Sequence, residues 1–325
     1  MEIITKLPDW SGCVILTSTC NLKCKYCYVE QSNRTISKSL IDNFINGMRY
    51  NSMNKHISFF GGEPMLLQNL IFDIANENKD FTFSLTTNGT IPINEHLKWP
   101  KNIAQVTFST EINETCYSMY RGDISYYNDI TENINLVHSC LPKARLCINV
   151  SMNKYVIEHP EMLVDFYDKF KAYEILIFFT KGYIDYDKYQ LYEFMLKLKK
   201  LNISLFKHLL MLDRDIDDNF HFSCTYDHKI TLDCNGDIIT CEKDGSIICN
   251  VDNYDEWCKV LVFTASNHRV FNDRCLNCVV PYSFCGVSCA SDLNKDLVVD
   301  ESCECQRLLW GLRMIERGEL NHDES

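Results

Sequence analysis

Three cysteines on one short stretch are the residues of this 325-residue chain best suited to chemistry. Cys20, Cys24 and Cys27 follow the apolar run 14–16 with C-x3-C-x2-C spacing, and no fourth cysteine follows nearby. Zinc sites and two-iron sites want four protein ligands. Three thiolates on one loop can instead hold three irons of a four-iron cubane, and the open fourth iron can bind a small molecule and pass it an electron. A common zinc or redox C-x2-C motif, with Cys20 incidental, is the alternative.

Strand-like apolar runs alternate with amphipathic stretches over the first 205 residues. This alternation predicts an α/β fold in which helices wrap a parallel sheet, a partial (β/α)6 TIM-like barrel. Because active sites of parallel sheets lie at the carboxyl ends of strands, the cysteine loop after the first strand is well placed. The predicted strands are 13–17, 56–60, 81–86, 106–110, 146–151 and 174–179; the clearest helical faces lie in 40–48, which Ser37 could cap, 130–137 and 191–198.

The pattern changes after about residue 205, where the acidic stretch 213–219 reads as part of a linker. Eleven cysteines follow between Cys224 and Cys305. Asn235-Gly236 between two β-branched runs predicts a hairpin, and 306–320 could form a helix. We therefore expect a partial barrel over 1–205, a linker over 206–223, and a small cysteine-rich domain over 224–325 that iron–sulfur clusters stabilise.

Composition narrows the class of protein. No signal-peptide pattern and no apolar run of about 18 residues occur, so we expect a cytoplasmic protein without a membrane span. In that compartment 18 cysteines indicate metal ligation rather than a disulfide framework. The net charge of −12 argues against a nucleic-acid partner, which prefers a basic face.

The cysteine triad resembles the signature of the radical S-adenosylmethionine (SAM) superfamily, in which a [4Fe–4S] cluster binds SAM. Gly61-Gly62-Glu63-Pro64 resembles the family motif whose backbone and glutamate contact the SAM amino group; a plain turn is the alternative. A buried Glu63 would need a cationic partner, which that ammonium supplies. The other matches to the family are Asn88 on the ribose side, Ser109 with Arg121 at the SAM carboxylate, and Tyr28 at the adenine, with an ordinary core tyrosine as its alternative. Glu111-Ile112 departs from the family's Asp-Gly.

The cysteines beyond residue 224 resemble the SPASM extension of peptide-modifying members of that superfamily, with one extra residue between Cys278 and Cys285. The resemblance implies two auxiliary [4Fe–4S] clusters. One would be held by Cys275, Cys278, Cys285 and either Cys303 or Cys305. The other would be held by Cys224, Cys241 and Cys289, and either Cys234 completes it or an iron stays open. We expect the remaining cysteines to be structural, among them Cys13, Cys116, Cys140, Cys147, Cys249 and Cys258.

The resemblance implies reductive cleavage of SAM to a 5′-deoxyadenosyl radical and oxidation, by crosslinking, of a ribosomally synthesised precursor peptide or protein. A low-potential donor such as a flavodoxin or ferredoxin would supply the electron. An anaerobic sulfatase-maturating enzyme is the alternative, with Glu242 standing where that group has a general-base aspartate. A non-catalytic iron–sulfur electron carrier is the alternative of another class. Crosslinking, epimerisation and formylglycine formation stay open at this point.

Overall fold

The computed structural model describes residues 11–51, 54–93, 98–179, 183–212, 229–239, 246–253, 256–257, 259–260 and 300–319. All six predicted strands of the first part are present, as are the three predicted helices. The strands are β1 (Ser11–Thr17), β2 (His56–Gly61), β3 (Thr82–Thr87), β4 (Ile103–Thr110), β5 (Arg145–Met152), β6 (Glu174–Phe179), β7 (Lys229–Leu232), β8 (Asp237–Ile239) and β9 (Ile247–Asn250). The helices are α1 (Lys38–Tyr50), the 3-10 helix η1 (Pro64–Leu67), α2 (Gln68–Glu77), α3 (Glu114–Tyr120), α4 (Ser125–Cys140), α5 (Lys154–Glu158), α6 (Pro160–Phe170), α7 (Lys188–Leu201), α8 (Ile203–Leu209) and α13 (Asp300–Glu316).

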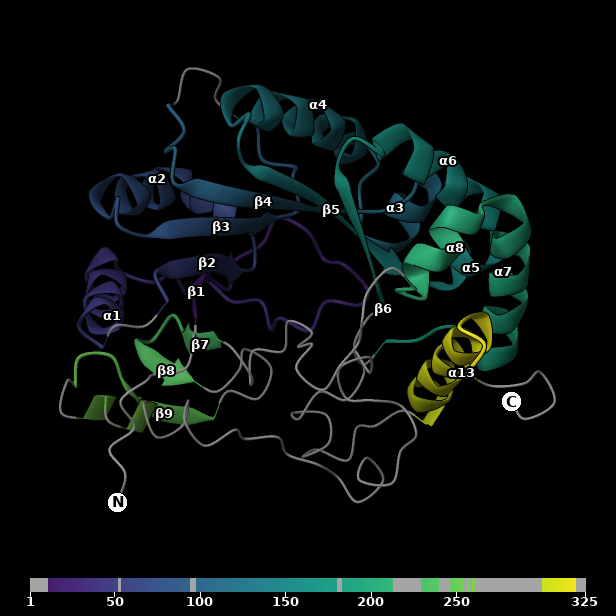
Figure 1. The fold of residues 1–325 in the computed structure, drawn as a ribbon. Helices are drawn as coiled ribbons and strands as arrows, with labels where there is room; N and C mark the ends of the chain where they lie inside the picture. Colours follow the sequence, from purple (N-terminus) through teal and green to yellow (C-terminus); the bar gives the residue numbers. More distant parts are fainter. Residues whose placement is uncertain are drawn as a thin grey trace. The chain divides into compact units, whose positions relative to one another are not determined.

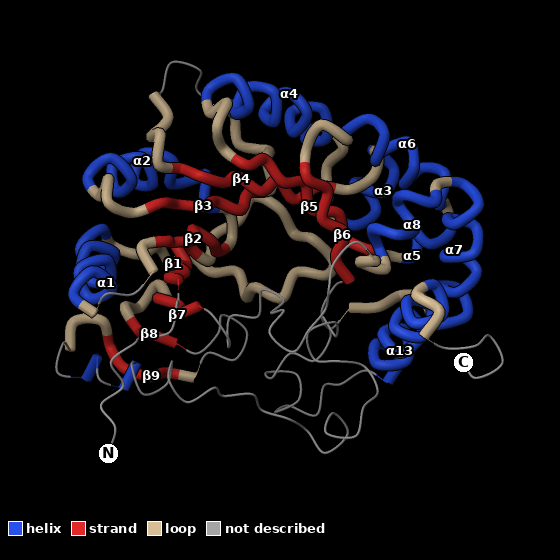
Figure 2. The backbone as a smooth tube through the Cα atoms, in the orientation of Figure 1, coloured by secondary structure: helices blue, strands red, loops and turns tan. Residues whose placement is uncertain are grey.

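The strands form an open sheet in the order β6-β5-β4-β3-β2-β1-β7-β8-β9 (Figure 2). Strands β1 to β4 pair in parallel with their sequence neighbours, which confirms the predicted α/β class. The chain divides into two compact units. The first unit holds residues 1–110, 118–148 and 223–269; the second unit holds 111–117, 149–222 and 270–325. Strand β5 therefore contributes residues to both units.

Helices α1, α2 and α4 cover one face of the sheet in the first unit (Figure 1). Helix α1 begins where the sequence predicts, because the Ser37 hydroxyl accepts a hydrogen bond from the Leu40 backbone N–H. Phe44 and Met48 on its apolar face are fully buried and meet the sheet at Gly12, where an added Cβ would touch both side chains. The helical spacing of apolar residues over 40–48 therefore correctly predicts the face of α1 that packs on the sheet.

The predicted hairpin at Asn235-Gly236 is present, formed by β7 and β8. Strand β7 also pairs in parallel with β1, with Gly12 opposite Ile230 and Val14 opposite Leu232. The hairpin, extended by β9, thus adds to the sheet of the first unit beside the strand that carries the cysteine loop. Both Ile230 and Leu232 are fully buried, so this short apolar run is a strand in the interior of the sheet.

The second unit contains the C-terminal helix, which the sequence predicts over 306–320 and which forms over α13. Arg313 of α13 is buried and donates to the carbonyls of Leu210 (2.7 Å) and Met211 at the end of α8. Both residues directly follow the last residue of α8, so the guanidinium caps the end of this helix and fixes α13 against it. No helix within the described ranges has both the length and the apolar character needed to cross a membrane.

Substitution of Gly47 tests the packing of α1 against the segment that follows β9. A Cβ at Gly47 would lie 2.2 Å from an indole carbon of Trp257, a buried ring. Although alanine is the better helix former, we expect Gly47→Ala to lower the denaturation midpoint, because overpacking typically costs about 1–3 kcal/mol. Gly311→Ala in α13, where a Cβ meets nothing within 4 Å, should instead stabilise by about 0.5–1 kcal/mol. A midpoint for Gly47→Ala at or above that of the wild type would contradict this packing.

Candidate active site

The Gly61-Gly62 turn after β2 is joined to the start of the cysteine loop by its backbone. The Gly62 N–H donates to the Thr17 carbonyl (2.7 Å), and the Glu63 N–H donates to the Thr19 carbonyl (2.9 Å). A Cβ on Gly62 would lie 2.2 Å from the Thr19 oxygen, and Gly61 has a φ of 137°. Only glycine allows backbones to approach this closely. The turn that the sequence assigns to SAM thus lies directly beside the loop of Cys20.

Glu63 is fully buried at the end of this turn. Its Oε1 accepts from the Thr87 hydroxyl (2.6 Å) and the Met65 N–H (2.9 Å), and its Oε2 accepts from the Asn88 N–H (2.7 Å). Burial raises the pKa of the Glu63 carboxyl, while these donors and the positive charge of Arg121 act in the opposite direction. The sequence predicts an external ammonium as compensation for this burial, and the chain itself supplies three hydrogen-bond donors to the carboxylate.

The sulfur of Cys20 is a hydrogen-bond acceptor for two other groups of the chain. The Leu22 N–H lies 3.4 Å from it and the Asn88 side-chain nitrogen 3.8 Å from it. Burial raises the pKa of the Cys20 thiol, whereas a thiol bound to a metal is deprotonated outright. Donors aimed at the sulfur suit a thiolate ligand. Cys24 is half-buried and Cys27 is exposed in the part of the chain that the structure describes.

The described residues contain no group of three His, Cys, Asp or Glu side chains that converges on a single metal ion. A cubane does not require such convergence, because each of its three thiolates binds a different iron. Three thiolates, with donors aimed at the Cys20 sulfur, fit a [4Fe–4S] cluster with one open iron, whereas a zinc site wants four protein ligands.

The cysteine loop also contacts the end of α3 and the residue that follows it. The Lys25 N–H donates to the Tyr120 carbonyl (2.8 Å), and the ring of Tyr26 stacks on that of Tyr120 at 6.5 Å between centroids. Arg121 is 6% exposed, and its guanidinium carbon lies 5.5 Å from the centre of the Tyr26 ring. The sequence prediction missed Tyr26, although an aromatic residue between two motif cysteines was a usable signal. Tyr28, the predicted adenine contact, is 44% exposed.

Ser109 is the other residue that the sequence predicts at the SAM carboxylate. Ser109 is half-buried near the end of β4. Glu111, the departure from the family pattern, is fully buried in the second unit. It accepts from the Asn153 side chain (3.1 Å) and the Cys116 thiol (3.5 Å), and burial raises the pKa of Cys116. Glu111 and the buried Cys116 therefore have structural roles in that unit.

The predicted general base Glu242 lies outside the described residues. So do most of the predicted auxiliary cluster ligands: Cys224, Cys241, Cys275, Cys278, Cys285 and Cys289. On α13, Cys303 is half-buried whereas Cys305 is fully buried. Side chains that are two residues apart on a helix, such as these two, point in roughly opposite directions. Cys234 donates its thiol hydrogen to the Ile15 carbonyl (3.2 Å), and burial raises the pKa of this thiol to about 11.

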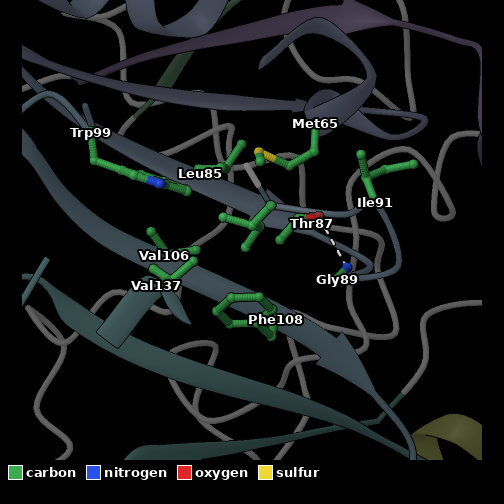
Figure 3. A pocket seen from close by; sticks show the side chains of 10 residues that line it. Met65, Leu85, Thr87, Gly89, Ile91, Trp99, Val106, Phe108 and Val137 are labelled. Carbon is green, nitrogen blue, oxygen red and sulfur yellow. Dashed lines mark hydrogen bonds between the residues drawn. The ribbon is translucent and has the colours of Figure 1, made fainter. Parts of the chain in front are cut away.

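A small apolar cavity lies between β3, β4 and α4 (Figure 3). Leu85, Phe108 and Val137 are among the apolar side chains that line it. The Thr87 hydroxyl marks the polar boundary, because it accepts from the Gly89 N–H (3.0 Å) and donates to Glu63. The cavity is a packing void of the core, and we place no ligand in it.

Residues 14–139 match the family model of the radical SAM superfamily. A curated relative, an S-adenosylmethionine-dependent nucleotide dehydratase from Fibrobacter sp. (strain UWH6), is 25% identical over 181 residues. That similarity covers 51% of this chain and 52% of the relative, so the chain spans about half the length of the curated protein that it matches.

The fold is similar to that of solved structures over most of the chain. The structure of anSMEcpe with bound AdoMet has a TM-score of 0.68 at 19% identity, over 94% of this chain and 97% of that chain. SuiB from Streptococcus suis, bound to the precursor peptide SuiA, has a TM-score of 0.63 at 17% identity, over 92% and 77%. The family match over β1 to α4 identifies residues 14–139 as a radical SAM domain, and the solved structures share the fold of this chain.

Proposed function

We propose that the chain is a radical SAM peptide maturase that oxidatively modifies, by crosslinking, residues of a ribosomally synthesised peptide. The supporting observation is that one connected polar network joins the cysteine loop to Glu63 and Asn88, with Arg121 beside it. Cys20, Cys24 and Cys27 would hold a [4Fe–4S] cluster, which would supply an electron for the reductive cleavage of SAM.

In this proposal the residues around the loop bind and orient SAM. The buried guanidinium of Arg121, with Ser109, holds the carboxylate, because the fork of an arginine matches a carboxylate with two hydrogen bonds. The Gly61–Pro64 turn contacts the amino group. Asn88 lies on the ribose side and Tyr28 contacts the adenine. Loops packed this closely also keep water away from a reactive intermediate.

A peptide substrate is supported at the level of the fold. SuiB is described with its precursor peptide SuiA, and anSMEcpe with a Cp18Cys peptide. In this proposal the SPASM-like cysteines would hold two auxiliary [4Fe–4S] clusters, which would supply a site for accepting an electron during oxidation of the substrate. A flavodoxin or ferredoxin supplies the first electron. In the sulfatase-maturating alternative, Glu242 acts as the general base.

The substrate class is tested with the cluster-loaded protein, SAM, dithionite and the peptide encoded by any short reading frame that is found beside the gene. Loss of two hydrogen atoms from that peptide by mass spectrometry supports the proposal. Formylglycine in a sulfatase peptide would favour the alternative. Dehydration of a nucleotide, with the peptide left unchanged, would overturn the peptide assignment.

The cysteine triad gives the first functional prediction. Cys24→Ala removes one of three cluster ligands, so we expect no 5′-deoxyadenosine from SAM and dithionite. Cys140→Ala is the matched control, because Cys140 is half-buried at the end of α4 and outside the loop. Its yield, quantified by chromatography, should equal that of the wild type. Normal yield from Cys24→Ala would sink the radical SAM assignment of the loop.

The role of Arg121 predicts a change in affinity. Arg121→Lys keeps the charge and loses the paired hydrogen bonds, each worth about 1.5–3 kcal/mol when a charged group is involved. We expect the Kd for SAM to rise at least about tenfold in equilibrium binding to the cluster-loaded protein. The control is Arg145→Lys at the exposed start of β5. An unchanged Kd for Arg121→Lys refutes the assigned contact.

The two cysteines of α13 give matched variants for the auxiliary cluster. We propose the half-buried Cys303 as the ligand and the fully buried Cys305 as a packing residue. Cys303→Ser should therefore lower the iron content by about four atoms per chain, the content of one cluster, while Cys305→Ala keeps the full content. The reverse result would exchange the two roles.

A further inference from the structure

Three polar side chains beside Cys20 form a closed ring of hydrogen bonds. The Asn88 amide nitrogen donates to Asn21 Oδ1 (2.9 Å), and the Asn21 amide nitrogen donates to the Thr90 hydroxyl (2.7 Å). The Thr90 hydroxyl closes the ring by donating to Asn88 Oδ1 (2.7 Å). Asn21 follows Cys20 directly in sequence, whereas Asn88 and Thr90 follow β3, so the ring ties two loops of the first unit together.

One backbone group fixes the direction of this ring. The Thr90 N–H lies 3.0 Å from Asn88 Oδ1, and a backbone N–H can only donate. The oxygen end of the Asn88 amide must therefore face Thr90, and its NH2 end must face the cysteine loop. An amide NH2 carries two hydrogens. One is used by Asn21, and the other is directed at the Cys20 sulfur, 3.8 Å from the nitrogen.

Asn88 is held at its backbone as well, because its N–H donates to the buried carboxylate of Glu63. Asn88 is 7% exposed and Thr90 is 3% exposed. A donor in such a setting acts through a lower effective dielectric than it would in water, so its effect on a nearby charge is larger.

We propose that Asn88 is a positioning residue for the cluster, oriented by Thr90 and Asn21, and that its NH2 group raises the reduction potential of the cluster through the Cys20 sulfur. This inference rests on the proposed function, in which Cys20 is a cluster ligand. Reduction adds a negative charge, and a hydrogen bond to a ligand sulfur stabilises the more negative state. If the ring only tied the two loops together, its loss would lower the stability of the protein and leave the reduction potential of the cluster unchanged.

The test is a redox titration of the reconstituted full-length protein without SAM, followed by electron paramagnetic resonance. The relevant signal is the one that Cys24→Ala lacks, which separates this cluster from any auxiliary one. We expect Asn88→Ala to shift the midpoint to more negative potential, by about tenfold in the equilibrium constant for reduction or about 59 mV for one electron. Thr90→Val, which removes the hydroxyl that orients Asn88, should shift it in the same direction by less. Thr90→Ser keeps the hydroxyl and should match the wild type.

The outcomes separate this inference from the proposed function. Unchanged midpoints in cluster-loaded Asn88→Ala and Thr90→Val would overturn the role of Asn88 and leave the cluster assignment intact. If Asn88→Ala does not hold its cluster, the comparison of Thr90→Val with Thr90→Ser decides. Absence of the Cys24-dependent signal from the wild-type protein would sink the proposed function, and this inference with it.

Discussion

The constraint on which the site depends is the backbone contact between the residues after β1 and the turn after β2. Two N–H groups of Gly62 and Glu63 donate to the carbonyls of Thr17 and Thr19, at a separation that admits no side chain on the turn. Parallel pairing of β1 with β2 brings these two segments to the same edge of the sheet. The cysteine loop therefore begins from a fixed point, although a loop of this length has no core of its own.

The burial of Glu63 makes the turn depend on hydrogen-bond donors at the end of β3. An isolated buried carboxylate is costly, so its three donors must all be in place when the turn folds. Two of those donors, the Thr87 hydroxyl and the Asn88 N–H, lie at the end of β3. Folding the turn thus fixes the backbone of Asn88, and the fixed backbone lets its side chain reach Cys20. The same residues that bury a charge also organise the proposed cluster ligand.

Much of this arrangement is visible in the sequence, because position along a parallel strand carries spatial meaning. Cys20, Glu63 and Asn88 each follow a predicted strand, and carboxyl ends of parallel strands share one edge. The partner of β7 was not predictable, because an apolar run such as 229–232 records burial and says nothing of which strand lies beside it. The hydrogen-bond partners of Glu63 were missed for a related reason. Met65 lies two residues away and Thr87 lies twenty-four away, and no sequence period links them.

The cysteine loop is held from two directions, and this explains how distant residues can act on its ligands. On one side the ring of Asn21, Asn88 and Thr90 fixes the start of the loop; on the other the Tyr120 carbonyl and ring hold Lys25 and Tyr26. Leu22 is a buried apolar side chain of the loop, and these neighbours add the polar and aromatic contacts that help to set the shape of the loop. A substitution in either neighbour therefore changes the position or environment of a cysteine without touching it. Ligand geometry at such a site is a property of the loops that surround the motif as much as of the motif itself.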